Sequence, residues 1–256
     1  MTQPQSADGG PVANVTQANF FEQNEEFRTL QLNLIAIHVV SEEVGADCFE
    51  RSILRAPNPE MKMRMAKTVM EEYGHHLRFR KLLEDLKLDW RDAVKDKAHL
   101  STFDVPIDSW VDQMVFLAVV DRAAAHQFRH FVKSRYEPFR LACQATLNEE
   151  YGHVGFGMDG VKQLLETEEG RRQVEIALMK WLPVGLASFG ADRSKSNERY
   201  RYWGFKSDTN ENMREGYYKQ VHAFVTADWR IDIPESIKGF LQTTALTFSD
   251  QAMYAG

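Results

Sequence analysis

The pentapeptide Glu-Glu-Tyr-Gly-His occurs twice in this chain of 256 residues, at residues 71–75 and at residues 149–153. Residues three apart on an α-helix lie on the same side of it, with Cβ atoms about 5–6 Å apart. The second glutamate and the histidine of each copy are therefore predicted to point in one direction. These predicted pairs are Glu72 with His75 and Glu150 with His153. A carboxylate and an imidazole directed at one point can bind a metal ion, so the repeat predicts two long helices that face each other across a metal site.

Helical periodicity predominates in the rest of the sequence, and the alternating pattern of β-strands is scarce. Pro57 and Pro59 are expected to end the first long helix, after which Asn58 caps the second. Asp108 is expected to cap the third, and residues 189–210 are expected to be mostly loop with a helical turn or two. The expected helices span residues 24–54, 59–86, 109–131 and 138–166, followed by shorter helices at 170–183 and 211–228. This pattern indicates an all-α fold, a four-helix bundle with additional C-terminal helices.

Two further acids are needed if the two pairs are to hold a dinuclear metal centre. Carboxylate-bridged di-iron bundles take one Glu-x-x-His from each of two helices and one acid from each of the other two. On the third helix, Asp121 follows an apolar run, where a carboxylate is costly to bury without a partner. On the first helix, Glu42 falls in step with the apolar inner face and is preferred to Glu43. Glu71 and Glu149 remain open as alternative ligands in the other register. Carboxylates with only two imidazoles suit iron or manganese better than zinc.

The residues around the predicted centre carry further expectations. Gly74 and Gly152 lie inside helices, where glycine costs about 1 kcal/mol relative to alanine. They are expected to let a helix or a substrate approach closely. Gly155, Gly157 and Gly160 are expected to permit close helix packing or a local distortion. The expected wall of a substrate pocket consists of Met70, Phe116, Leu117 and Phe128.

Composition and charge argue against several other classes of protein. The formal net charge is −6 and the isoelectric point is about 5.8, which gives no basic face for a nucleic acid. The apolar runs are far too short to span a bilayer, so no membrane partner is expected. Residues 1–20 lack the features of a secretory signal and are expected to form a flexible N-terminal arm before a single domain at 21–256. Cys48 and Cys143 are expected to be free thiols, which favours a cytoplasmic location.

Several short motifs resemble one known family. They are SEEVG (41–45), RAP (55–57), EEYGH (71–75), VDRAA (120–124), NEEYGH (148–153) and WLPVGLASFG (181–190). In order and spacing, over residues 25–234, the chain resembles the catalytic subunits of phenylacetyl-CoA epoxidases. These belong to the phenylacetate-catabolism branch of the ferritin-like di-iron monooxygenases. The resemblance therefore implies a ferritin-like bundle that holds two iron ions (Fe²⁺/Fe³⁺).

The resemblance also implies particular residues and partners. The residues that match the family's iron ligands are Glu42, Glu72, His75, Asp121, Glu150 and His153, and the four carboxylates among them are the implied catalytic groups. The implied reaction uses O₂ to insert an oxygen atom, by epoxidation or hydroxylation, into an aromatic and CoA-linked small molecule. The implied partners are an electron-donor reductase that uses NAD(P)H and either a ferritin-like non-catalytic subunit or a second copy of this chain.

The sequence leaves other functions open. One is a ferritin-like oxidase or iron-handling protein without an organic substrate, and another is a scaffold subunit. A third is a di-iron oxygenase that acts on a small molecule without CoA. The chain departs from the family in a shorter C-terminus and in residues 191–206. The clustered basic residues that could contact CoA are Arg51, Arg55, Lys62, Arg64 and Lys67.

Overall fold

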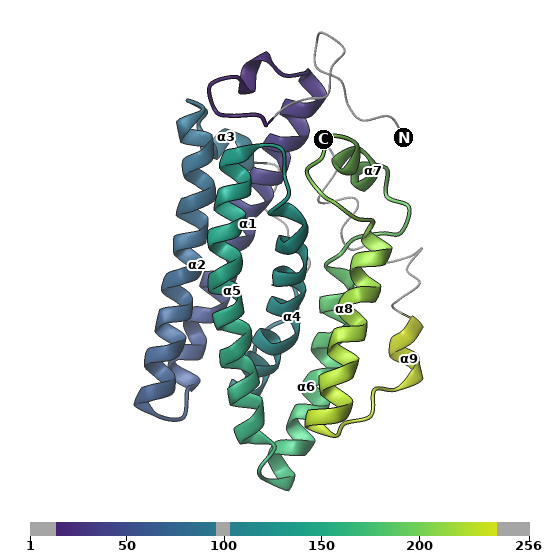
Figure 1. Ribbon diagram of the computed structural model, residues 1–256. Coiled ribbons are helices and arrows are strands. Elements are labelled where there is room, and N and C mark those ends of the chain that lie inside the picture. The colour runs from purple at the N-terminus through teal and green to yellow at the C-terminus, as the bar shows by residue number, and fades with distance from the viewer. Residues whose placement is uncertain (1–13, 96–102, 240–256) are drawn as a thin grey trace.

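The computed structural model describes residues 14–95 and 103–239, and these residues form an all-α, ferritin-like bundle (Figure 1). Within these ranges the only β-type pairing is an isolated bridge between Val15 and Tyr136. The α-helices are α1 (Glu25–Arg55), α2 (Pro59–Asp85), α3 (Trp90–Val94), α4 (Trp110–Phe131), α5 (Glu137–Leu164), α6 (Glu168–Ala187), α7 (Lys195–Tyr202), α8 (Asn210–Phe224) and α9 (Glu235–Lys238). A 3₁₀ turn at Phe20–Glu22 precedes α1, and a π turn at Val225–Trp229 follows α8.

The ends of the long helices follow local capping chemistry. The Asn58 side chain accepts a hydrogen bond from the Met61 amide at 2.9 Å, and Pro59 occupies the first helical position of α2, as predicted. The predicted cap of α4 is wrong by one residue. Ser109, not Asp108, caps this helix, and its hydroxyl accepts from the Asp112 amide at 3.0 Å. Ser is as good a cap as Asp, so composition alone did not distinguish the two neighbours.

The four long helices α1, α2, α4 and α5 form the bundle. Helix α1 packs along α2, and α4 packs along α5. Residues 56–58 connect α1 to α2, and residues 132–136 connect α4 to α5. Because both connections are short, the second helix of each pair runs antiparallel to the first. Helices α6 and α8 pack on α4 at the side of the bundle (Figure 1). Helix α4 is therefore enclosed by neighbours on most of its circumference.

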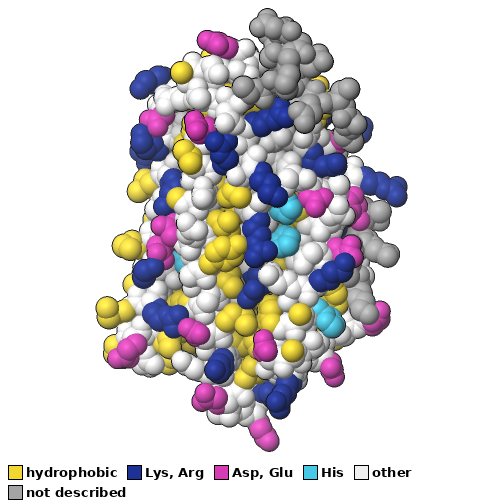
Figure 2. Space-filling model, viewed as in Figure 1, with side chains coloured by type: hydrophobic (Ala, Val, Ile, Leu, Met, Phe, Trp, Pro, Cys, Tyr) yellow, Lys and Arg dark blue, Asp and Glu magenta, His cyan; other side chains and the backbone are white. Residues whose placement is uncertain are grey.

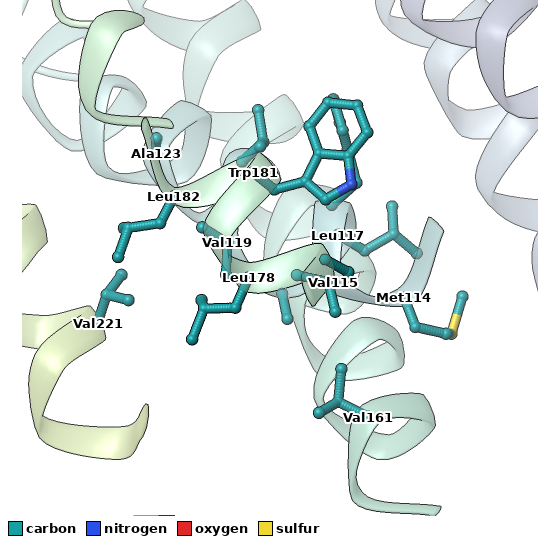
Figure 3. Packing of buried hydrophobic residues seen from close by; sticks show 14 of the residues in the cluster. Met114, Val115, Leu117, Val119, Ala123, Val161, Leu178, Trp181, Leu182 and Val221 are labelled. Atoms are coloured by element: carbon teal, nitrogen blue, oxygen red, sulfur yellow. The ribbon is translucent and has the colours of Figure 1, made fainter. Parts of the chain in front are cut away.

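This enclosure explains the apolar sequence of α4. Every residue from 113 to 121 is buried. Figure 3 shows Val161 of α5, Trp181 of α6 and Val221 of α8 gathered around this helix. The indole nitrogen of Trp181 donates to the Asp112 carboxylate at 3.0 Å, so this large side chain is buried with its polar atom satisfied.

The segment at 189–210 agrees with the prediction, because α7 adds about two helical turns to a stretch that is otherwise mostly loop. The helix expected at 211–228 ends as the π turn. Arg214 of α8 is completely buried. Its guanidinium donates to the carbonyl oxygens of Leu186, at 3.1 Å, and Gly190, and it pairs with Asp192. These bonds fix the turn that follows α6 against α8.

The N-terminal prediction requires a correction. Residues 1–13 of the predicted flexible arm lie outside the described residues, but the remainder of the arm is packed. The Val15 amide donates to the Arg135 carbonyl at 2.9 Å, and the Glu137 amide donates to the Val15 carbonyl at 2.8 Å. Both Val15 and Phe20 are buried. The packed part of the chain therefore begins before residue 21, because two apolar side chains within a polar stretch find a place beside α5.

Two expectations drawn from composition can be compared with the structure. Cys48 and Cys143 are free thiols, as predicted. Across residues 14–95 and 103–239, no helix combines the length and the hydropathy that a bilayer-spanning segment requires.

The helix glycines divide into two groups. A Cβ atom added to Gly74, Gly152 or Gly155 would meet no atom within 4 Å. The expectation that Gly74 and Gly152 admit a close neighbour is therefore wrong within the described chain. Gly157 and Gly160 do permit close packing of α5 on α4. A Cβ at Gly157 would lie 2.7 Å from the Leu117 Cβ and would also clash with the backbone of α4.

We predict opposite effects for two neighbouring substitutions on α5. Gly157→Ala should lower the free energy of unfolding by about 1–3 kcal/mol, because the new methyl group overpacks the contact with α4. Gly155→Ala should raise it by up to about 1 kcal/mol, because the site is open and alanine favours the helix. Denaturant unfolding of both variants checks this. Equal stabilities would contradict the close approach of α4 and α5.

Candidate metal centre

The six predicted site residues converge in the middle of the bundle. Each of the four long helices contributes at least one of them, and all six are buried. They are Glu42 from α1, Glu72 and His75 from α2, Asp121 from α4, and Glu150 and His153 from α5. Helical spacing within each element and antiparallel packing between the elements produce this convergence.

The six residues form two overlapping groups. In each group, the potential ligand atoms lie within 4.8 Å of one another. The first group is Glu42, Glu72, His75 and Glu150, and the second is Glu72, Asp121, Glu150 and His153. Glu72 and Glu150 belong to both groups. Since the two imidazole ring centroids are 5.8 Å apart, the arrangement offers two adjacent positions with two shared carboxylates between them.

The histidines point their Nδ1 atoms inward. Nδ1 of His75 lies 3.2 Å from Glu42 Oε2, 3.6 Å from Glu72 Oε2 and 3.5 Å from Glu150 Oε1. Nδ1 of His153 lies 3.0 Å from Glu72 Oε1 and 3.9 Å from Asp121 Oδ2. Each imidazole thus presents one nitrogen to the acids of one group.

The outer nitrogens explain why the acids are doubled. Nε2 of His75 lies 2.9 Å from a carboxylate oxygen of Glu149, and Nε2 of His153 lies 3.2 Å from one of Glu71. The first glutamate of each repeat therefore holds the histidine of the other repeat. A carboxylate that accepts from Nε2–H leaves Nδ1 free as a ligand and fixes the ring orientation.

These contacts resolve the register that the sequence left open. Glu72 and Glu150 lie at the centre, whereas Glu71 and Glu149 lie one step outside it. The outer acids are themselves held by cations, since Lys67 pairs with Glu71 and Arg78 pairs with Glu149 at 2.9 Å. On α1, Glu42 lies inside. The Glu43 side chain is about half exposed and lies 3.8 Å from His76.

Burial makes the charged forms of the inner acids costly. It raises the pKa of Glu42 to about 7 and that of Glu150 to about 8. Burial, followed by the nearby carboxylates, raises the pKa of Asp121 well above its ordinary value. Glu72 behaves differently. Burial again opposes its ionisation, but the adjacent imidazoles outweigh burial and lower the pKa of Glu72 to about 2.

The imidazoles respond to the same carboxylates. Burial disfavours imidazolium, but the adjacent acids outweigh it and raise the pKa of His75 to about 12 and that of His153 to about 9. Without cations, the cluster therefore retains protons on its imidazoles. Metal ligation requires neutral imidazoles and ionised carboxylates. Four carboxylates carry a charge of about −4, which two divalent cations balance.

Buried polar atoms without hydrogen-bond partners in the cluster also fit metal binding. Within the described chain, Asp121 Oδ2 and His153 Nδ1 are buried and make no hydrogen bond of acceptable geometry. Buried polar atoms without a partner are rare, and each calls for an explanation. A metal ion between Asp121 and His153 would satisfy both atoms. The residues present therefore fit a pair of metal ions.

A cavity of about 180 Å³ adjoins the cluster. The inner carboxylates form part of its wall, and most of the remaining wall is aromatic or aliphatic. Of the predicted wall residues, Phe116 and Phe128 line it. Leu117 is buried elsewhere, against Gly157, and Met70 is 64% exposed, so both of these predictions are wrong.

Several lining residues were not predicted. They include Phe103, Phe131, Gln127, Ser188, Phe189 and Lys206. Gln127 lies one residue before Phe128 on α4 and Phe131 lies three residues after it, so both could have been found from the helical step. Ser188, Phe189 and Lys206 lie outside the four bundle helices, and no spacing rule links them to the centre.

We predict that the outer glutamates tune metal affinity. Glu149→Gln should weaken Fe(II) binding about 10–100-fold, because the amide accepts less strongly from His75 Nε2 and orients the ring poorly. Glu71→Gln should act in the same way through His153. Glu84→Gln, on the exposed side of α2, is the matched control. Anaerobic calorimetry measures the affinities, and an affinity of Glu149→Gln equal to that of the control would contradict this role.

Comparison with known proteins gives a separate line of support. The family model described as "Phenylacetic acid catabolic protein" matches residues 17–243, a range that contains all six converging residues. One of the subunits of the 1,2-phenylacetyl-CoA epoxidase of Escherichia coli (strain K12) is 26% identical over 201 residues. This alignment covers 75% of the chain and 65% of the relative, so the chain spans slightly less than two thirds of that protein's length. Since the family match extends over most of its length, the chain belongs to the phenylacetic acid catabolic protein family.

Proposed function

We propose that this protein is a di-iron monooxygenase that uses O₂ to insert an oxygen atom into an aromatic, CoA-linked substrate by epoxidation or hydroxylation. The observation that carries the proposal is the buried cluster of four carboxylates and two imidazoles beside an aromatic-lined cavity. The relative in E. coli is named as part of an epoxidase for phenylacetyl-CoA, which supports this reaction class.

In this proposal the two groups of residues hold two iron ions. His75 and Glu42 serve one position, His153 and Asp121 serve the other, and Glu72 and Glu150 lie between them. When bound, a pair of iron ions supplies electrons and open coordination positions for the reductive activation of O₂. Carboxylates with two imidazoles favour iron or manganese over zinc.

The chain itself supplies orientation and an apolar surround. Glu149 and Glu71 hold the histidine rings, so that Nδ1 is presented inward before any metal binds. Phe116 and Phe128 form part of the cavity wall next to the inner carboxylates, where they exclude water from the reacting region. An aromatic ring placed in this cavity lies against carbon and faces the carboxylate cluster.

The cavity argues against the rival functions. An iron-handling oxidase needs a path for ions but no apolar chamber beside its metal site. A scaffold subunit with relic residues would have no reason to retain all six side chains in one converging set. An oxygenase that acts on a small molecule without CoA shares every feature of the site and is the second candidate. The basic residues considered for CoA do not separate these two, because Arg64 pairs with Asp159 and Lys67 pairs with Glu71.

The reaction requires electrons from outside the chain, for which we propose a reductase that uses NAD(P)H.

Helix α2 exposes Met63, Met70 and Leu77, which are seven residues apart and share one face. We expect this apolar row to contact a non-identical subunit, since the E. coli relative is named as one subunit of its enzyme. Figure 2 shows exposed hydrophobic side chains together with a column of Lys and Arg side chains on one face of the molecule.

We predict a defined iron stoichiometry and a dependence on reductant. The purified chain should bind about two Fe(II) ions. With a reductase, aryl-CoA thioesters and ¹⁸O₂, it should incorporate one labelled oxygen atom per product. Glu72→Ala and His153→Ala should lose both metal and turnover, whereas Glu84→Ala should retain them.

Other outcomes would point to other functions. Iron loading far beyond two ions per chain would indicate storage, and absence of iron binding would indicate a scaffold. Labelled products from free aromatic acids, with none from thioesters, would favour the second candidate. Normal turnover in the His153→Ala variant would exclude the proposed centre.

A further inference from the structure

Lys206 is a buried cation in the wall of the cavity. Its side chain is 7% exposed, and its ammonium lies 5.2 Å from the centroid of Phe131 and 5.9 Å from that of Tyr200. These ring contacts are its only charge-stabilising contacts in the described chain, where its ammonium forms neither an ion pair nor a hydrogen bond. A cation in such surroundings pays a desolvation cost that ring faces offset only in part.

Arg214, a buried guanidinium among the described residues, has different surroundings. Arg214 has no exposed surface, and it is matched by the Asp192 carboxylate and two backbone carbonyls. A cation that stabilises a fold needs such partners, because an unpaired buried charge is destabilising. Burial lowers the pKa of Lys206 to about 8, so that the ammonium is still largely charged near neutral pH. The surroundings of Lys206 therefore suit an ammonium that binds a ligand rather than one that stabilises the fold.

The separation between Lys206 and the cluster can be followed along α4. Asp121 and Phe131 lie on this helix ten residues apart, which corresponds to a rise of about 15 Å. Asp121 belongs to the carboxylate cluster, and Phe131 lies under the Lys206 ammonium. All three residues line the same cavity. The cavity thus has carboxylates in one part and a single ammonium toward the Phe131 end, with Phe128 and His38 also in its wall.

The neutral polar groups of the wall are already engaged. The Gln127 amide donates to the Ser188 carbonyl at 3.3 Å, and the Ser188 hydroxyl donates to the Gly185 carbonyl at 2.9 Å. Nδ1 of His38 lies 2.7 Å from the Leu34 carbonyl oxygen, to which it donates. Among the cavity residues, Lys206 is therefore the strong donor that is left for a ligand.

We propose that Lys206 determines substrate specificity by binding an acyl oxygen, either a thioester carbonyl or a free carboxylate, so that the attached aromatic group is directed toward the carboxylate cluster. This assignment rests on the proposed function of that cluster. The aromatic wall offers an acyl oxygen no hydrogen bond, and the metal-free carboxylate cluster disfavours it. The ligand consequently has one favourable orientation. At about 180 Å³, the cavity is smaller than the roughly 300–1,000 Å³ of pockets that enclose drug-sized ligands, which suits an arylacyl group alone.

The test compares three probes of similar aromatic bulk under anaerobic conditions. Phenylacetate carries a free carboxylate, the N-acetylcysteamine thioester of phenylacetate carries a thioester carbonyl, and ethylbenzene carries no oxygen. Binding is measured by calorimetry to the full chain without added metal, where no iron ion competes with Lys206 for the carboxylate. Lys206→Met should weaken binding of at least one acyl probe about 10–100-fold and leave ethylbenzene within about twofold. The acyl probe that loses more affinity identifies the source of the oxygen.

The control is Lys219→Met, which makes the same change at an exposed lysine paired with Glu215. It should alter none of the affinities. Lys206→Met should also melt at or above the wild-type temperature, because it removes an unpaired buried charge. Equal weakening of ethylbenzene, a melting temperature well below that of the wild type, or unchanged acyl affinity would each overturn the proposal.

A variant that fails to fold would itself contradict the proposal, and the wild type then supplies a second measurement. It should bind an acyl probe more tightly than ethylbenzene, and an equal or lower affinity would also overturn the assignment. These binding results do not depend on turnover. Lys206-dependent binding without oxygenated product would count against the monooxygenase and leave the role of Lys206 intact.

Discussion

The burial of four carboxylates between four helices is the constraint on which the rest of this structure depends. Carboxylates in an apolar interior are costly unless they are paired or bound to cations. Here the repeated pentapeptide meets part of that cost by reciprocity, since the outer glutamate of each copy holds the histidine of the other. The reciprocity also fixes how α2 and α5 face each other. A rotation of either helix by one residue, about 100°, would exchange inner and outer acids and break both contacts.

The C-terminal helices make this arrangement possible. In an isolated four-helix bundle, the outer face of α4 would meet water, and its uninterrupted apolar run would be exposed. Helices α6 and α8 cover that face, and buried Arg214 ties the turn after α6 to α8. Ser188 and Phe189 reach the cavity from this turn, and Lys206 reaches it from the segment between α7 and α8. The additions therefore both complete the core and finish the cavity wall.

The sequence was informative where a local rule decides the geometry. Helical spacing placed Glu72 with His75, and apolar flanks identified Asp121, because both depend on a single helix. The choice between Glu71 and Glu72 depends on how two helices are rotated against each other, which no single-helix pattern contains. Gly74 failed as a marker of close approach for the same reason, since a glycine does not reveal what faces it. Residue spacing could not predict Lys206 as a cavity residue, because only tertiary packing brings it to the site.

The division between local and tertiary information also separates the two parts of the site. The carboxylate and histidine cluster is built from bundle helices whose relative rotation is fixed by several mutual contacts, so few substitutions there preserve it. The cavity wall draws on side chains such as Phe189 and Lys206, which ligate nothing and can change without disturbing the cluster. At 26% identity, a relative could therefore keep the cluster while its cavity wall differs. Under the proposed function, the segments after α6 and α7 would contribute to substrate selection together with bundle residues such as Phe128, and the repeat would hold the metal ions.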